Sequence, residues 1–131
     1  MFDVLVIGAG HAGIEAAAAA ARMGANTCLV TMDLSRAGSM PCNPSVGGPA
    51  KGIVVREIDA LGGVMPRAAD ATALQFKMLN TSKGPGVQCL RVQSDKLAYS
   101  RWMAAFLKQQ PHLTVVENRV ESLDIEEGAV R

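Results

Sequence analysis

The segment from Gly8 to Gly13 constrains the fold of this chain more than any other feature. It has the spacing Gly-x-Gly-x-x-Gly and follows a short apolar run, rich in β-branched residues, at positions 3–7. An alanine-rich stretch comes next and ends at Gly24, and a second apolar run occupies residues 26–30. This order predicts a strand, a tight turn, a helix and a second strand, which together form a dinucleotide-binding βαβ unit.

Each glycine of this turn has a distinct role in such a unit. Gly8 permits the turn out of the strand, Gly10 lets the backbone approach a pyrophosphate, and Gly13 lets the helix pack on the strand. Backbone N–H groups at the start of the helix, together with the helix dipole, then face the phosphates. The predicted cofactor-binding residues of the turn are Gly8, Ala9, Gly10, His11, Ala12 and Gly13.

Composition narrows the class of protein. The chain has 131 residues, enough for one domain with a core, and its net charge of +1 gives no global field that favours nucleic acid. Basic residues are unevenly placed, because residues 77–101 hold five of them against one acid. Three cysteines without paired spacing fit a reducing cytosol, and no His/Cys cluster has the spacing of a metal site. With no leader or membrane segment expected, we predict a cytoplasmic protein.

Glycines and prolines divide the rest of the chain. We expect a functional loop over residues 33–50, a helix over 49–61, a second glycine-containing loop over 80–93, and a helix capped by Ser94 that runs to about Gln110. Apolar side chains share one side of each helix: Ile53, Val54, Ile58 and Leu61 in the first, and Leu97, Trp102, Met103 and Phe106, as a buried stripe, in the second.

The end of the sequence reads as a series of short strands. We expect strands at 113–117 and 120–125, a turn at 126–128, and a third strand that begins at Ala129 and stops at Arg131. Sheets rarely end in the first residues of a strand. We therefore expect residues 1–131 to be the front portion of a longer protein.

Two positions carry possible chemistry outside the glycine turn. Most dinucleotide-binding proteins have an acid at the end of the second strand to hold the ribose, whereas this chain has Thr31, with Asp33 as a possible substitute. Cys42 lies between two prolines in a polar loop, where Lys51 and a helix N-terminus favour its thiolate, so it is a candidate nucleophile. Cys28 lies among strand residues and is expected to pack in the core.

Several blocks of this sequence resemble the GidA/MnmG proteins, flavoenzymes that modify the wobble uridine of tRNA. Thr31 is also the residue that this family tends to carry, and the resemblance runs the full length of the chain. The blocks that carry it are residues 8–17, residues 41–48 with Lys51-Gly52, residues 57–63 and residues 79–85.

The resemblance implies an α/β fold, a three-layer Rossmann-like FAD-binding domain with a central parallel sheet and a small antiparallel β element, incomplete in this chain. FAD would lie with its pyrophosphate on the glycine turn, and a backbone contact to its adenine would come from Val120. The family's NAD-binding insertion and its C-terminal helical region for tRNA and partner are expected to be absent from residues 1–131, so that this piece alone would be inactive.

The resemblance also implies an activity. Such proteins use FAD, NADH and methylene-tetrahydrofolate to build a carboxymethylaminomethyl or aminomethyl group on C5 of the wobble uridine. They act as homodimers with the GTPase MnmE. Cys42 would attack the uridine ring and so activate C5, while Asn43, Lys51, Lys83 and Arg91 are candidate contacts to the RNA. Gly86 and the segment 88–90 depart from the family pattern, which weakens the case for RNA contact by that loop.

Three other functions remain open at this point. The folate-dependent tRNA uridine-54 methyltransferase shares the fold, but it usually has an acid at the position of Thr31 and a different cysteine loop. A nucleotide-binding module without catalysis would hold a redox-silent flavin, and the Cys42 loop argues against it. A generic FAD-dependent oxidoreductase would reduce an electron acceptor with NADH and ignore tRNA.

Overall fold

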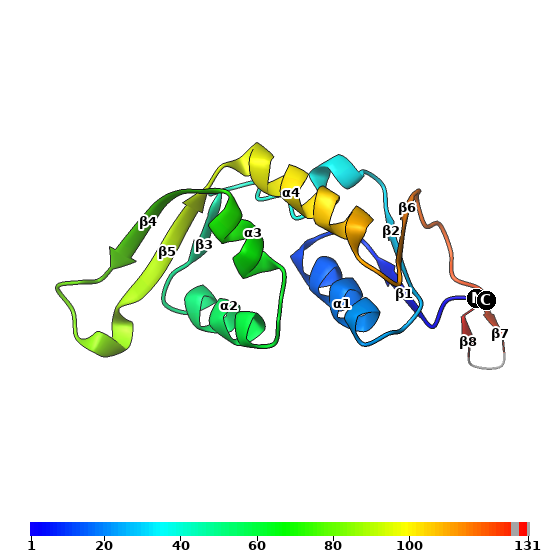
Figure 1. Cartoon of the computed structure of the whole chain (residues 1–131), viewed down its shortest axis with the longest axis horizontal. Helices are drawn as coiled ribbons and strands as arrows, with labels where there is room; N and C mark the ends of the chain where they lie inside the picture. The colour runs from blue at the N-terminus through cyan, green and yellow to red at the C-terminus, as the bar shows by residue number, and fades with distance from the viewer. Residues whose placement is uncertain (127–128, 131) are drawn as a thin grey trace.

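The computed structural model of the chain describes residues 1–126 and 129–130. Two three-stranded sheets lie at opposite ends of the molecule with helices between them, and the N-terminus lies beyond the parallel sheet (Figure 1). The parallel sheet and the small antiparallel sheet confirm the predicted α/β fold class.

The parallel sheet contains β1 (Val4–Ile7), β2 (Thr27–Thr31) and β6 (Leu113–Glu117), in the order β1-β2-β6. Strand β2 is central, and its first three residues are buried. The predicted strands at 3–7, 26–30 and 113–117 are therefore confirmed to within a residue at each end.

Helix α1 (His11–Arg22) connects β1 to β2. Its buried side consists of Ile14 and three alanines, and small side chains let the helix lie close to the sheet. A Cβ atom on Gly13 would collide with the carbonyl oxygen of Gly8, which confirms that this glycine is needed for helix–strand packing. At the other end, Gly24 adopts φ +90° just after the helix.

The antiparallel sheet contains β3 (Ser45–Gly47), β4 (Ala73–Leu79) and β5 (Cys89–Ser94), in the order β3-β5-β4. The predicted loops at 33–50 and 80–93 were wrong in part, because they contain β3 and most of β5. Both strands pair with segments distant in sequence, so local breaker residues do not reveal them. Short 3-10 helices also lie in these loops, at Leu34–Arg36 (η1) and Pro85–Val87 (η2).

Two helices pack beside this sheet. Helix α2 (Lys51–Ala60) agrees with the predicted helix at 49–61, and α3 (Met65–Ala71) follows it. No residue of α2 is fully buried, and its apolar side chains Ile53 and Val54 are more than half exposed. By contrast, α3 buries Met65 and two alanines in the core. The carboxylate of Glu15 on α1 accepts hydrogen bonds from the backbone N–H groups of Val64 and Met65, at distances of 2.6–3.0 Å, and thereby caps α3.

Helix α4 (Lys96–Gln109) differs from its prediction in two respects. Its N-cap is Asp95, whose Oδ1 accepts from the N–H groups of Leu97 and Ala98, both at 2.9 Å, whereas Ser94 ends β5. The expected buried stripe was also wrong except at Met103, since Leu97 is 67% exposed. The buried residues are Tyr99, Ser100, Met103 and Leu107.

Trp102 and Phe106 lie half-buried on α4 rather than in the core. Their rings stack with centroids 5.6 Å apart, and the guanidinium of Arg67 lies 5.9 and 5.4 Å from the two centroids. The two rings pack against the edge of the core, and Arg67 on α3 contacts them from the other side. They are therefore stabilised by contacts without full burial.

The last described residues form β7 (Ile125–Glu126) and β8 (Ala129–Val130), an antiparallel pair. The predicted strand at 120–125 was therefore wrong except for Ile125, and the expected third strand corresponds to β8. Residues 127–128 of the predicted turn, and Arg131, lie outside the described residues.

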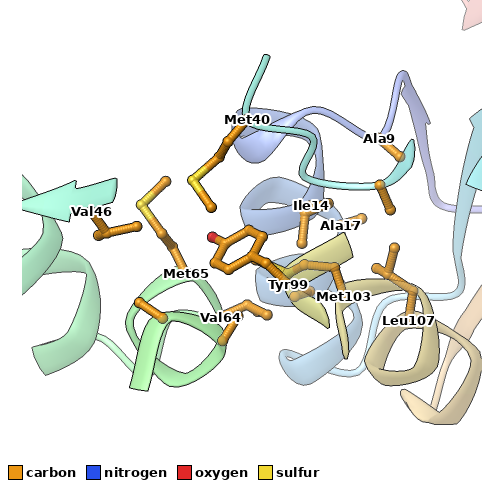
Figure 2. Packing of buried hydrophobic residues seen from close by; sticks show 14 of the residues in the cluster. Ala9, Ile14, Ala17, Met40, Val46, Val64, Met65, Tyr99, Met103 and Leu107 are labelled. Atoms are coloured by element: carbon orange, nitrogen blue, oxygen red, sulfur yellow. The ribbon is translucent and has the colours of Figure 1, made fainter. Parts of the chain in front are cut away.

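The core joins the two ends of the molecule at Tyr99. This side chain is fully buried, and its ring lies beside Ile14 with the hydroxyl directed toward Met40 and Met65 (Figure 2). Cys28 is 3% exposed, as predicted for a core residue, and burial raises the pKa of its thiol. Within the described part of the chain, no helix has the length and apolar character needed to cross a membrane.

Candidate dinucleotide-binding site

A cavity of about 570 Å³ opens at the carboxyl ends of β1 and β2. Ligands of open α/β sheets bind outside the carboxyl ends of the strands, which is where this cavity lies. It brings together five of the eight predicted cofactor-binding residues, namely Gly8, Ala9, Gly10, Thr31 and Val120, whereas His11, Ala12 and Gly13 do not line it. The other lining residues are Ile7, Val30, Met32, Asp33, Arg36, Ser39, Asn118 and Arg119.

The glycine turn forms one wall of the cavity and has room for a phosphate. Gly8 adopts φ +98°, and its N–H donates to the carbonyl of Val30 at 2.7 Å, which fixes the turn against β2. Gly10 is the N-cap of α1, and a Cβ atom added there would meet nothing within 4 Å. Because no side chain caps α1, the N–H groups of its first turn are available to an anion. This cradle fits the pyrophosphate of a dinucleotide.

Thr31 stands at the end of β2, half-buried, where an acid usually holds the ribose. Its carbonyl accepts from the N–H of Asn118 at 2.9 Å, which ties the segment after β6 to this wall. Asp33 also lines the cavity, but its Oδ1 accepts from the N–H and the hydroxyl of Ser35, at 2.9 and 2.6 Å. Asp33 therefore caps η1. No hydrogen bond of the Thr31 hydroxyl to another described residue is found, so this hydroxyl is the better candidate to bind a ribose.

The sequence reading missed four polar lining residues: Arg36, Ser39, Asn118 and Arg119. Asn118 and Arg119 follow directly after β6, so the rule that sites lie beyond strand ends could have found them. Arg36 comes at the end of η1 in a predicted loop, and no local signal marked it. Neither arginine has an acidic partner among residues 1–126 and 129–130, so both leave this wall positive.

His11 begins α1 but does not line the cavity. Its ring is half-buried, lies 5.7 Å from the ring of Tyr99, and keeps Nε2 buried without a hydrogen-bond partner. Burial lowers the pKa of His11, the charge of Lys51 lowers it further, and Glu15 opposes both. The imidazole is therefore neutral at neutral pH, and its ring contacts the buried ring of Tyr99 rather than the cavity.

The Cys42 loop begins beside this cavity, which Ser39 lines, but Cys42 itself does not line it. Cys42 is exposed, as is Asn43, and neither lines the cavity. The ammonium of Lys96 donates to the carbonyl of Pro41 at 3.2 Å, and that of Lys51 donates to the carbonyl of Ser45 at 3.0 Å. These two bonds anchor the loop on both sides of Cys42 and leave the thiol open to a large substrate. Arg91 lies on β5, and Lys83 lies in the loop that connects β4 to β5.

Comparison with known proteins identifies the family. The family described as Glucose inhibited division protein A matches residues 3–131. This chain belongs to the GidA family. A relative from Exiguobacterium sibiricum, the tRNA uridine 5-carboxymethylaminomethyl modification enzyme MnmG, is 62% identical over 126 residues, which cover 96% of this chain and 20% of the relative. The chain thus spans about a fifth of the length of the family members it matches.

Solved structures of the family show the same fold. The structure of Aquifex aeolicus GidA is similar with a TM-score of 0.92 and 53% identity, over 98% of this chain and 21% of the other. Pseudomonas aeruginosa PqsL, a probable FAD-dependent monooxygenase, shares the fold alone, with a TM-score of 0.63 and 17% identity over 98% of this chain and 36% of PqsL.

Proposed function

We propose that this chain forms the N-terminal part of the FAD-binding domain of a tRNA-modifying enzyme. The enzyme would install a carboxymethylaminomethyl or aminomethyl group on C5 of the wobble uridine. The observation that carries the proposal is the similarity to MnmG enzymes along nearly the whole chain. The match of the family Glucose inhibited division protein A to residues 3–131 agrees with this similarity.

The residues that would hold FAD are those of the cavity at the ends of β1 and β2. The first turn of α1 and Gly10 would bind the pyrophosphate, Thr31 the ribose, and the backbone at Val120 the adenine. The positive charges of Arg36 and Arg119 on this wall would attract the negatively charged phosphates. When bound, FAD would supply the redox chemistry for which NADH and methylene-tetrahydrofolate are the proposed co-substrates.

Cys42 is the proposed catalytic residue. Its exposed thiol, in a loop anchored by Lys51 and Lys96, has the access that a nucleotide of a folded RNA requires. Addition of its thiolate to C6 of the uridine ring would make the neighbouring C5 nucleophilic. After C5 has bonded to its new carbon, loss of the C5 proton and breaking of the C6–S bond would restore the ring double bond and release the cysteine thiolate. Asn43, Lys51, Lys83 and Arg91 are the proposed RNA contacts. The working unit would be a cytoplasmic homodimer acting with the GTPase MnmE.

Nucleoside mass spectrometry of tRNA from cells lacking the gene tests the function. Loss of 5-carboxymethylaminomethyl- or aminomethyl-type wobble uridines supports the proposal. Loss of 5-methyluridine would instead identify a uridine-54 methyltransferase, and survival of all modified uridines would leave only a flavin oxidoreductase or a nucleotide-binding module.

The role of Cys42 is tested by complementing the same cells with Cys42→Ser. We expect the wobble modification to stay absent while FAD content and the unfolding midpoint match the wild type. The matched control is Cys89→Ser, which changes a buried cysteine of β5 and should restore modification if the protein folds. Restoration by both variants would remove Cys42 from the mechanism.

A further inference from the structure

The antiparallel sheet presents one polar face that the site above does not use. Strand register places Gly47 of β3, Arg91 of β5 and Lys77 of β4 side by side in one row. In the adjacent row, Val46 pairs with Val92, and both are buried in the core. Since side chains alternate along a strand, Arg91 and Lys77 lie on the face that points away from the core.

The two basic residues of this row stand directly opposite each other. Like charges in that position destabilise a sheet unless something compensates them. Neither side chain has an acidic partner in the described part of the chain, and the Nε atom of Arg91 is buried with no hydrogen-bond partner. An anion on this face would relieve the repulsion between Arg91 and Lys77.

The residues that flank the pair in the described sheet are uncharged. Gly47 contributes no side chain to the row, because its φ of +116° and the close carbonyl oxygen of Leu90 require glycine there. On the same face, Gln75 and Gln93 pair opposite each other and add amide donors. Lys83 is exposed in the loop that connects β4 to β5, where it extends the positive charge beyond the row.

The same face leads toward Cys42. Ser45 pairs with Gln93 and precedes Gly47 by two residues, so it lies on this face about 7 Å along β3 from the basic row. Cys42 comes just before β3 in the anchored loop. The dinucleotide cavity is lined by neither Lys77 nor Arg91, so the charge of the row is not needed for the cofactor phosphates.

We propose that Lys77 and Arg91 bind a backbone phosphate of the RNA substrate, so that an RNA strand lies across β3, β5 and β4 and its reacting nucleotide reaches Cys42. This inference rests on the proposed tRNA-modifying function and adds Lys77 as a positioning residue. The sheet lies at the end of the molecule opposite the N-terminus (Figure 1), and neither Lys77 nor Arg91 lines the dinucleotide cavity.

The test is tRNA binding by fluorescence anisotropy at several salt concentrations, using the protein as its gene encodes it, loaded with FAD. We expect Lys77→Gln and Arg91→Gln each to weaken binding about fivefold to tenfold and to reduce the slope of log K against log salt by about one. The matched control is Lys108→Gln, which removes an exposed lysine of α4 and should change neither quantity. Arg91→Lys keeps the charge and should retain most of the slope.

Particular results would overturn this inference. An unchanged salt slope in both glutamine variants, or an equal loss in Lys108→Gln, would show that the row does not bind RNA phosphate. If the variants bind tRNA normally while the deletion strain lacks modified wobble uridines, the inference fails and the proposed function stands. If the wild-type protein binds no tRNA and the modified uridines persist in the deletion strain, both fail together.

Discussion

The parallel sheet β1-β2-β6 buries its central strand, whereas the antiparallel sheet β3-β5-β4 leaves its outer strand open. The first three residues of β2 are buried, and Leu29 has no exposed surface. In β4, five of the seven residues are exposed, including Leu74, Phe76 and Met78. Helix α1 packs its buried side on the parallel sheet, while α2 beside the antiparallel sheet has no buried residue.

This difference separates two tasks. Apolar burial at the parallel sheet stabilises the strands that hold the glycine turn in place. The antiparallel sheet carries exposed apolar and basic side chains, which are available for contact with other molecules or with other parts of a longer protein. The following experiments test this comparison, from the largest expected effect to the smallest.

The largest contrast is expected between two leucines. Leu29→Ala in β2 should lower the free energy of unfolding by about 2–5 kcal/mol, because it leaves a cavity in the core. Leu74→Ala in β4 should change it by no more than about 0.5 kcal/mol, because that side chain is 67% exposed. Urea unfolding of the two variants measures both values. Equal losses would mean that β4 is covered in the intact protein, and the comparison would no longer hold.

Two glycines of the turn should separate stability from binding. Gly13→Ala should cost about 1–3 kcal/mol of stability, since its Cβ collides with the backbone of Gly8. Gly10→Ala meets open space, so we expect near wild-type stability but at least about tenfold weaker FAD binding, because the methyl group takes the place of a phosphate. Thermal unfolding and FAD titration test the pair. Tight FAD binding by Gly10→Ala would contradict the proposed cradle.

Glu15 connects the two regions, since it lies on α1 and caps α3. Glu15→Ala should lower stability by about 1 kcal/mol, because two backbone N–H groups lose their acceptor. The control Glu57→Ala removes an exposed carboxylate of α2, for which no bond to another described residue is found, and should have little effect. Amide hydrogen exchange should become faster in α3 for Glu15→Ala and not for Glu57→Ala. An equal increase of the exchange rate in α3 and in both sheets would show that the cap does not act locally.

The smallest expected effect is a pH dependence at His11. Burial and the charge of Lys51 hold the pKa of this group below its usual value of 6.5 in the folded state. Below about pH 6.5 the unfolded chain therefore binds a proton that the folded chain refuses, so stability falls as the pH decreases and is level above that value. Urea unfolding at pH 5.5 and 7.5 should show a smaller difference for His11→Gln than for the wild type. An unchanged difference would place the titrating group elsewhere.

Local sequence patterns predicted the parallel half of the molecule well. The strand, glycine turn, helix and second strand at residues 3–31 form one continuous unit, so the periodicity of the apolar residues and the glycine spacing are sufficient to predict it. The same reading assigned eight residues to the cofactor site. The structure brings five of them to one cavity, namely Gly8, Ala9, Gly10, Thr31 and Val120, whereas His11, Ala12 and Gly13 do not line it. The contribution of Arg36 could not be read in this way, because the 3-10 helix that carries it leaves no periodic signal.

The antiparallel half was poorly predicted for a physical reason. Strands β3 and β5 pair across more than forty residues of sequence, and their partners, rather than their own composition, determine that they are strands. The same dependence on distant contacts explains why the N-cap of α4 is Asp95 and not the predicted Ser94. Ser94 pairs with Ala73 in β5, where its N–H donates to the carbonyl of Pro44, so it is not free to begin a helix.

The sequence by itself determined that this chain has a βαβ unit, a turn with the spacing Gly-x-Gly-x-x-Gly, and an isolated cysteine in a polar loop, because each of these depends on residues adjacent along the chain. Only the tertiary structure decided that Arg36 and Arg119 line the cavity at the ends of β1 and β2 and that Lys77 stands opposite Arg91. These groupings depend on strand register and on the packing of distant segments, which local periodicity does not encode.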